Sequence, residues 1–116
     1  MESRAICRYI PSSPRKMRLV VDLIRGMQVD RAIEVLHFQT KTAARDAEKV
    51  LRSAVSNLLN QDEKKKVDLH EMFIKEAYVN AGPVMKRISP APMGRAYRIR
   101  KRSCHVTIVV TMKNSN

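Results

Sequence analysis

The chain has 116 residues, of which 44% are hydrophobic and only 4% aromatic, and it carries a formal net charge of +12 at pH 7. This length fits one domain, residues 1–116, with a modest aliphatic core, and the charge favours a polyanionic partner, nucleic acid before an anionic membrane. It has no run of eighteen apolar residues and only two cysteines, so neither a transmembrane span, a signal peptide nor a disulfide scaffold is expected.

The first two-thirds of the chain predict one strand followed by three helices. The segment "SRAICRYIP" alternates weakly and ends at Pro11, which indicates a short strand. In "SSPRKMRLVVDLIRG", Ser13 is a capping residue, Pro14 suits the first helical position and Gly26 suits the exit. A short second helix is predicted to begin with Asp30 as its cap. The segment "TKTAARDAEKVLRSAVSNLLN" keeps the apolar spacing of a helix for over four turns.

From Leu69 onwards the hydrophobic period changes to two, and "LHEMFIKEAYVN" and "SCHVTIVVT" predict two strands of a hairpin. One face of the second strand is apolar and consists of Cys104, Val106, Ile108 and Val110. Continued backwards, the same face becomes cationic at Arg102, Arg100 and Arg98. The predicted fold is therefore α+β: three helices packed on a small antiparallel sheet, with a long protruding β-hairpin arm. The arm spans residues 82–102, and each leg is roughly 30 Å long at about 3.3 Å per residue.

Charge divides the chain into two parts. Residues 1–81 hold fifteen basic and eleven acidic residues, whereas residues 82–116 hold eight basic residues and no acid. An arm with little apolar surface cannot offset its own ordering entropy, so it needs an anionic partner. A second basic cluster, Arg15, Lys16 and Arg18, opposes the dipole of the first helix. Phosphates near that helix end would favour these cations, and a solvated helix end is an equally weighted alternative.

The sequence offers no set of residues for catalysis. His37, His70 and His105 have no ligand spacing with one another or with the cysteines, and three glycines form no phosphate-binding loop. We therefore expect no enzyme, no metal and no cofactor. Three rivals to an RNA-binding structural protein remain open: a dimeric DNA-bending protein with a proline-tipped β-ribbon, an RNA-processing enzyme, and an arm that docks on anionic lipid.

Two segments, "SPRKMRLVVDLIRG" and "GPVMKRISPAPMGRAYRIRKRSCHVTIVV", resemble the bacterial-type large-subunit ribosomal protein L-twenty-two family from about Ala5 to Val110. The long motif "GRAxRIxKRxxHxxVVV" is matched by Gly94, Arg95, Ala96, Arg98, Ile99, Lys101, Arg102, His105, Val109 and Val110. The order of strand, three helices and long hairpin also fits this family.

The resemblance implies a cytoplasmic structural protein of the ribosome, with its body on the outer face of the large subunit. Its arm would thread between segments of large-subunit ribosomal RNA, support early assembly and line the peptide exit tunnel near the macrolide site. The implied partners are this RNA, neighbouring large-subunit proteins and the nascent peptide, with one copy per ribosome and no membrane.

The predicted RNA-binding residues are Arg15, Lys16, Arg18, Lys86, Arg87, Arg95, Arg98, Arg100, Lys101 and Arg102. The resemblance places Met85, Lys86, Arg87, Ile88, Ser89, Pro90, Ala91, Pro92 and Met93 at the tunnel tip, and the first three are expected near the far end of the arm.

Overall fold

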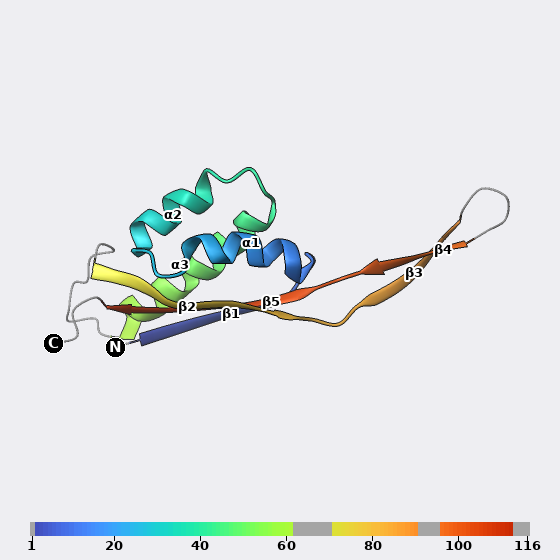
Figure 1. Ribbon diagram of the computed structural model, residues 1–116. Coiled ribbons are helices and arrows are strands. Elements are labelled where there is room, and N and C mark those ends of the chain that lie inside the picture. The colour runs from blue at the N-terminus through green and yellow to red at the C-terminus, as the bar shows by residue number, and fades with distance from the viewer. Residues whose placement is uncertain (1, 62–70, 91–95, 113–116) are drawn as a thin grey trace.

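The computed structural model describes residues 2–61, 71–90 and 96–112, and its elements follow the predicted order (Figure 1). The elements are β1 (Glu2–Ile10), α1 (Pro14–Ile24), α2 (Val29–His37), α3 (Ala43–Gln61), β2 (Met72–Ala81), β3 (Met85–Pro90), β4 (Ala96–Lys101) and β5 (Cys104–Met112). The three helices cover one face of a three-stranded antiparallel sheet, and β3 and β4 project away from this body as a hairpin. The predicted α+β fold class is confirmed.

The body has the strand order β1-β5-β2, so β5 is the central strand and pairs with both neighbours in antiparallel fashion. Helix α3 packs on β1 and β5, whereas α1 packs on β2. The predicted apolar face of β5 is fully buried beneath these helices and comprises Cys104, Val106, Ile108 and Val110. The hydrophobic period of two therefore located the core side of the sheet.

The predicted start of the first helix agrees with the structure. At α1, the Ser13 hydroxyl accepts a hydrogen bond from the Lys16 amide at 3.3 Å, Pro14 is the first helical residue, and Gly26 follows the helix with φ +82°. The prediction that Asp30 caps the second helix is wrong. Helix α2 begins at Val29 after Gln28, because buried Val29 is the first core contact of the helix, and the Asp30 carboxylate lies within its first turn.

The hairpin leaves the body at a short junction where β2 and β5 stop pairing. The Gly82 amide donates to the Ser103 carbonyl at 2.9 Å, and the Ser103 hydroxyl donates to the Pro83 carbonyl at 2.8 Å. Beyond this junction β3 and β4 pair only with each other. The protein consequently extends over 66 × 24 × 18 Å with a radius of gyration of 17.5 Å, compared with about 13 Å for a compact chain of this length.

Glycine at position 82 is required by close packing at this junction. A Cβ atom there would lie 2.5 Å from the Ser103 hydroxyl oxygen and 3.2 Å from the His105 Cε1 atom. We expect Gly82→Ala to lower the free energy of unfolding by about 1 kcal/mol, because the displaced hydroxyl loses its hydrogen bond to Pro83. Chemical denaturation followed by circular dichroism measures this change.

A double-mutant cycle with Ser103→Ala separates the clash from other effects of the alanine. If the hydroxyl carries the cost, Gly82→Ala is expected to be clearly less damaging in the Ser103→Ala background than in the wild type. Strictly additive losses would show that the hydroxyl contact does not explain the requirement for glycine.

Candidate nucleic-acid interface

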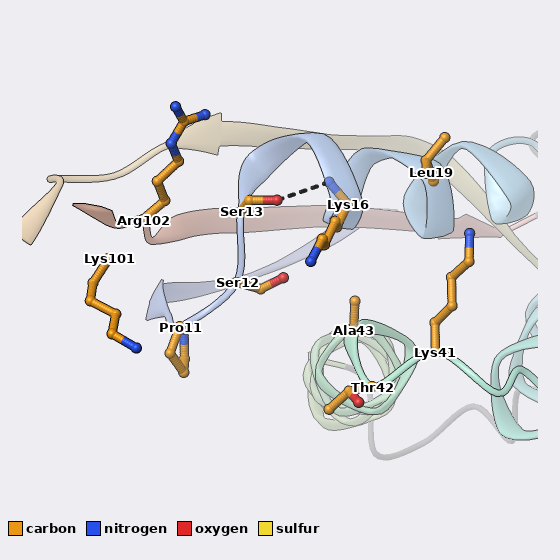
Figure 2. Close-up of a pocket in the computed structure, with 10 residues that line it drawn as sticks. All are labelled: Pro11, Ser12, Ser13, Lys16, Leu19, Lys41, Thr42, Ala43, Lys101 and Arg102. Atoms are coloured by element: carbon orange, nitrogen blue, oxygen red, sulfur yellow. Dashed lines mark hydrogen bonds between the residues drawn. The ribbon is translucent and has the colours of Figure 1, made fainter. Parts of the chain in front are cut away.

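A hollow of about 670 Å³ lies at the root of the hairpin and is lined by three segments that are distant in sequence (Figure 2). The connection from β1 into α1, the start of α3 and the end of β4 meet there. The lining residues are Pro11, Ser12, Ser13, Lys16, Leu19, Lys41, Thr42, Ala43, Lys101 and Arg102. The fold therefore places the N-terminal ends of two helices beside the last residues of the arm, where it returns to the body.

Four of these lining residues are cations and none is an acid. Lys16 projects from the first turn of α1, Lys41 precedes α3, and Lys101 and Arg102 come from the strand that returns from the arm (Figure 2). The positive ends of two helix dipoles add to this charge, and cations near such ends are unfavourable in the free protein. An anion in the hollow would offset both repulsions, as phosphates do at helix N-termini.

Sequence reasoning foresaw three of the four cations, Lys16, Lys101 and Arg102, as RNA contacts, but not that they lie together. It missed Lys41. The available signal was its position, because Lys41 immediately precedes α3 just as the predicted basic cluster occupies the start of α1. Each of these cations lies near the positive end of a helix dipole, where a cation is unfavourable. Arg15 is exposed on α1 and does not line the hollow.

The apolar face of β5 does not continue into the arm as one regular pleat, contrary to the expectation from the sequence. Strand β4 ends at Lys101 and β5 begins at Cys104, so the residues between them leave the regular pleat. As a result, the consecutive residues Lys101 and Arg102 both line the hollow, although strict alternation would separate them.

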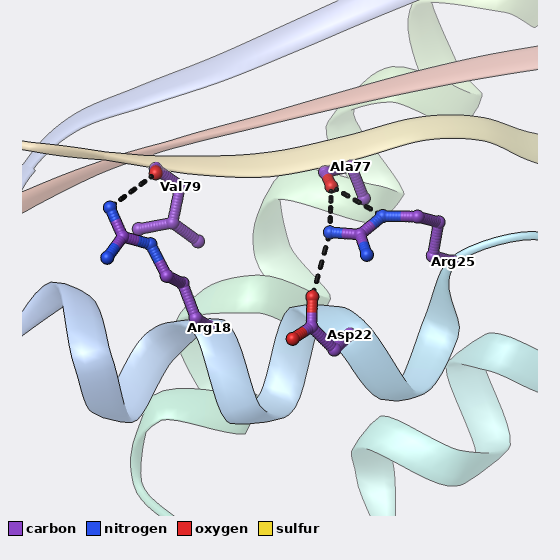
Figure 3. Close-up of polar contacts among 5 residues, drawn as sticks. All are labelled: Arg18, Asp22, Arg25, Ala77 and Val79. Carbon is purple, nitrogen blue, oxygen red and sulfur yellow. Dashed lines mark hydrogen bonds and ion pairs between the residues drawn. The ribbon is translucent and has the colours of Figure 1, made fainter.

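Arg18 adds positive charge to the body and also forms a hydrogen bond within it (Figure 3). Its guanidinium donates to the Val79 carbonyl at 3.2 Å, and the Arg25 guanidinium donates to the Ala77 carbonyl at 3.0 and 2.7 Å. Arg25 also forms an ion pair with Asp22 at 2.8 Å. Strand β2 is at the sheet edge, so these two arginines occupy carbonyl oxygens that another strand could otherwise bind. Contact of Arg18 with RNA stays a prediction.

The hairpin register corrects one expectation about the arm. Met85 pairs with Lys101, Lys86 with Arg100, and Arg87 with Ile99, which places residues 85–87 at the end of β3 nearest the body. Their expected position near the far end is wrong, because the body sheet already ends at Ala81 and the arm begins only a few residues later. The far end of the described ladder is the pair Pro90 and Ala96.

The structure describes only some of the remaining tip and arm residues. Ile88, Ser89, Arg98 and Arg100 lie in the ladder between β3 and β4. Ala91, Pro92, Met93 and Arg95 lie outside the described residues.

The described residues do not bring together a catalytic or metal-binding group. Burial raises the pKa of the Cys104 thiol, which therefore stays protonated near neutral pH and is a core residue, as predicted. Within residues 2–61, 71–90 and 96–112, no three His, Cys, Asp or Glu side chains are grouped as metal ligands. None of the described helices is both long and apolar enough to cross a membrane.

A basic α+β body with a protruding hairpin and a cationic hollow at its root has the charge distribution that favours a polyanionic partner. Comparison with known sequences identifies the class of protein. The sequence model of the family described as ribosomal protein L22p/L17e matches residues 5–111, and the chain belongs to this family. The resemblance inferred from the two quoted segments is thereby confirmed. The family consists of structural ribosomal proteins and not enzymes, and a ribosomal protein of this bacterial type is cytoplasmic.

Several bacterial relatives match over nearly the whole chain. "Large ribosomal subunit protein uL22" of Chlorobaculum tepidum is 54% identical over 112 residues, covering 95% of this chain and 92% of the relative. The protein of the same name from Solibacter usitatus is 51% identical over 115 residues, covering 99% and 100%. That from Bacteroides fragilis is 52% identical over 107 residues, covering 92% and 78%.

Proposed function

We propose that the chain is a structural constituent of the large ribosomal subunit and binds large-subunit ribosomal RNA through the hollow and the hairpin. The observation that carries this proposal is the convergence of four cations, with no acid, where the arm leaves the body. The names of the bacterial relatives support the large ribosomal subunit as the assembly that contains this chain. The cationic lining of the hollow supports this surface as the place where RNA binds. Phosphate contacts would provide most of the affinity, and the fit of the elongated protein to RNA shape would provide specificity.

The hairpin supports the same proposal through its register. Lys86 and Arg100 occupy directly opposite positions in the ladder between β3 and β4. Like charges at opposite positions destabilise an isolated hairpin, so an anionic environment favours the paired arm. RNA on either side of the arm would supply that environment and support folding of the subunit during assembly.

Two further points are proposed for this chain: the far end of its arm lines the peptide exit tunnel, and one copy is present in each ribosome. A hairpin that extends the molecule to 66 Å can reach from a surface position into the subunit, so its far end is proposed to line the exit tunnel and meet the nascent peptide. The helices bury their apolar faces on the sheet of the same chain, so one copy completes its own core and a monomer suffices. Neighbouring large-subunit proteins would contact the body.

The RNA-binding role of the hollow can be tested at Lys41. We expect Lys41→Ala to weaken binding to an in vitro transcript of bacterial large-subunit ribosomal RNA several-fold at 0.1 M salt. The dependence of log K on log salt should flatten by about 0.7 to 0.9, because one phosphate contact and its released counterion are lost. Filter binding at a series of salt concentrations measures both quantities.

Lys49→Ala is the matched control, because Lys49 is an exposed lysine on α3 outside the hollow. Its salt dependence is expected to equal that of the wild type. Equal flattening in both variants would mean that only total charge matters and that the hollow is not an RNA site. The assembly itself is tested by sedimentation, and loss of the wild-type chain from large subunits after a high-salt wash would contradict the proposed function.

A further inference from the structure

A strained aromatic residue lies at the end of β1, immediately before the hollow. Among the described residues, Tyr9 is the only non-glycine residue with a positive φ, at +59°. The register between β1 and β5 shifts between Cys7 and Ile10, so Tyr9 belongs to a bulge opposite His105. Glycine usually occupies a left-handed position in a bulge, and bulges often re-aim a side chain towards a functional surface.

The Tyr9 ring at this bulge is exposed to solvent. The Tyr9 amide donates to His105 Nδ1 at 3.0 Å, and the two rings meet edge to face with centroids 5.0 Å apart. The Tyr9 residue is nevertheless 66% exposed. Because Nδ1 accepts a hydrogen bond, the neutral His105 ring carries its proton on Nε2 and offers a donor beside the exposed tyrosine.

The charge around this aromatic pair favours a polyanionic ligand. The chain has no acidic residue from Ser3 to Val21 or from Ala77 to Asn116, and these two segments contain Tyr9 and His105. Pro11, only two residues after Tyr9, already lines the hollow. His105 alternates with buried Cys104 and Val106, so the ring that packs on it lies on the sheet face turned away from the helices, and RNA bound in the hollow would reach this ring by continuing past Pro11.

A second aromatic pair on the same molecule provides a comparison. The rings of His37 and Phe38 also meet edge to face, with centroids 5.3 Å apart, and Phe38 is 80% exposed. However, a carboxylate oxygen of Glu48 lies 3.7 Å from His37 Nδ1. The same Glu48 oxygen also accepts hydrogen bonds from the Arg52 guanidinium. An ion-paired acid therefore lies beside this second pair, whereas the two segments that contain Tyr9 and His105 have no acid, and this difference makes Phe38 a useful comparison.

We propose that Tyr9 and His105 form a binding site for an unpaired nucleobase of the RNA whose backbone occupies the hollow. The base would stack on the Tyr9 ring, and His105 Nε2–H would donate to a base or ribose oxygen. An unpaired base is required because only such a base exposes its face to an aromatic side chain. This inference rests on the proposed RNA-binding function and adds to it a site on the sheet.

The chain contains no tryptophan, so Tyr9→Trp introduces a single fluorescent reporter at the proposed site. We expect its emission to be strongly quenched when the transcript of bacterial large-subunit ribosomal RNA is bound. Phe38→Trp is the control and should keep most of its emission at the same saturation. RNA binding by Tyr9→Trp without quenching would overturn the nucleobase site alone, whereas failure of the wild type to bind RNA in the parallel filter assay would overturn the proposed function as well.

Two further substitutions distinguish the ring from the backbone. Tyr9→Asn removes the ring but tolerates a positive φ, so its unfolding midpoint should stay within about 4 °C of the wild type while RNA affinity falls about tenfold. Tyr9→Phe keeps the ring face and should bind almost as tightly as the wild type. Unchanged affinity of Tyr9→Asn for the naked transcript, with loss of the variant from assembled subunits, would assign the surface to a neighbouring protein and overturn the proposal.

Discussion

Replacing Leu51 by alanine is expected to lower the free energy of unfolding by about 3 kcal/mol, the largest effect on stability predicted for a single site. Leu51 is fully buried on α3, the helix that packs on β1, β5 and both other helices. Its neighbours on the buried side of the helix, Ala47 and Ala54, are too small to fill the resulting cavity. Since small domains have a net stability of about 5–15 kcal/mol, the variant should lose much of its resistance to denaturant.

Leu59→Ala on the same helix is the control, because Leu59 is 39% exposed and its helix propensity changes little on substitution by alanine. Its loss should stay below about 1 kcal/mol. Urea denaturation followed by circular dichroism measures both variants. Similar losses at the two positions would mean that α3 does not pack on the sheet through Leu51.

The body could be predicted from the sequence because each of its elements repeats a strong local signal. Helix α3 keeps the apolar spacing of a helix throughout its length. Strand β5 has an apolar residue at every second position from Cys104 to Val110, and it pairs with a strand on each side. The start of α2 was misplaced for a physical reason. Asp30 is a good capping residue, but burial of Val29 determines where the helix begins, and Gln28 forms a β-bridge with Phe73. Packing between distant segments, which propensity does not contain, decided the boundary.

The arm was predictable in charge but not in register. Hairpin register is set by turn geometry and by an apolar face, and the sequence of the arm has no regular alternation of apolar and polar residues. The sequence therefore could not show that Met85 pairs with Lys101 near the body. Similarly, Lys41 reaches the hollow because α3 begins beside α1 and the end of β4, a proximity that follows only from the packed fold.

The cations of this protein serve two physical purposes that composition alone does not distinguish. Arg18 and Arg25 bind carbonyl groups on the free edge of β2 and thereby shield the sheet. Lys16 and Lys41 line the hollow and have no acidic neighbour in its lining. The first pair should matter to the free protein, and the second should matter once RNA is present.

Removing three arginines from the returning strand of the arm should separate RNA binding from stability most clearly. We expect the triple variant Arg98→Ala, Arg100→Ala and Arg102→Ala to unfold at nearly the same temperature as the wild type, because these positions lie in or at the root of the arm and outside the buried core of the body. The salt dependence of RNA binding should flatten by about 2 units if each arginine meets one phosphate of unpaired RNA. At 0.1 M salt the lost counterion release corresponds to an affinity about 100-fold weaker.

The control for this variant removes the same charge from the helices, through Arg31→Ala, Lys49→Ala and Arg52→Ala. All three of these residues are exposed, and none lines the hollow. Calorimetry of the free proteins and filter binding over a range of salt concentrations compare the two variants. We expect the control to lose only a few-fold in affinity, because its charges act on RNA through screened, long-range attraction. Equal flattening in both variants would show that the arm arginines act through net charge and do not meet phosphates. A large fall in the unfolding temperature of the arm variant alone would show that β4 supports the body, so that the arm and the body would not be independent in stability.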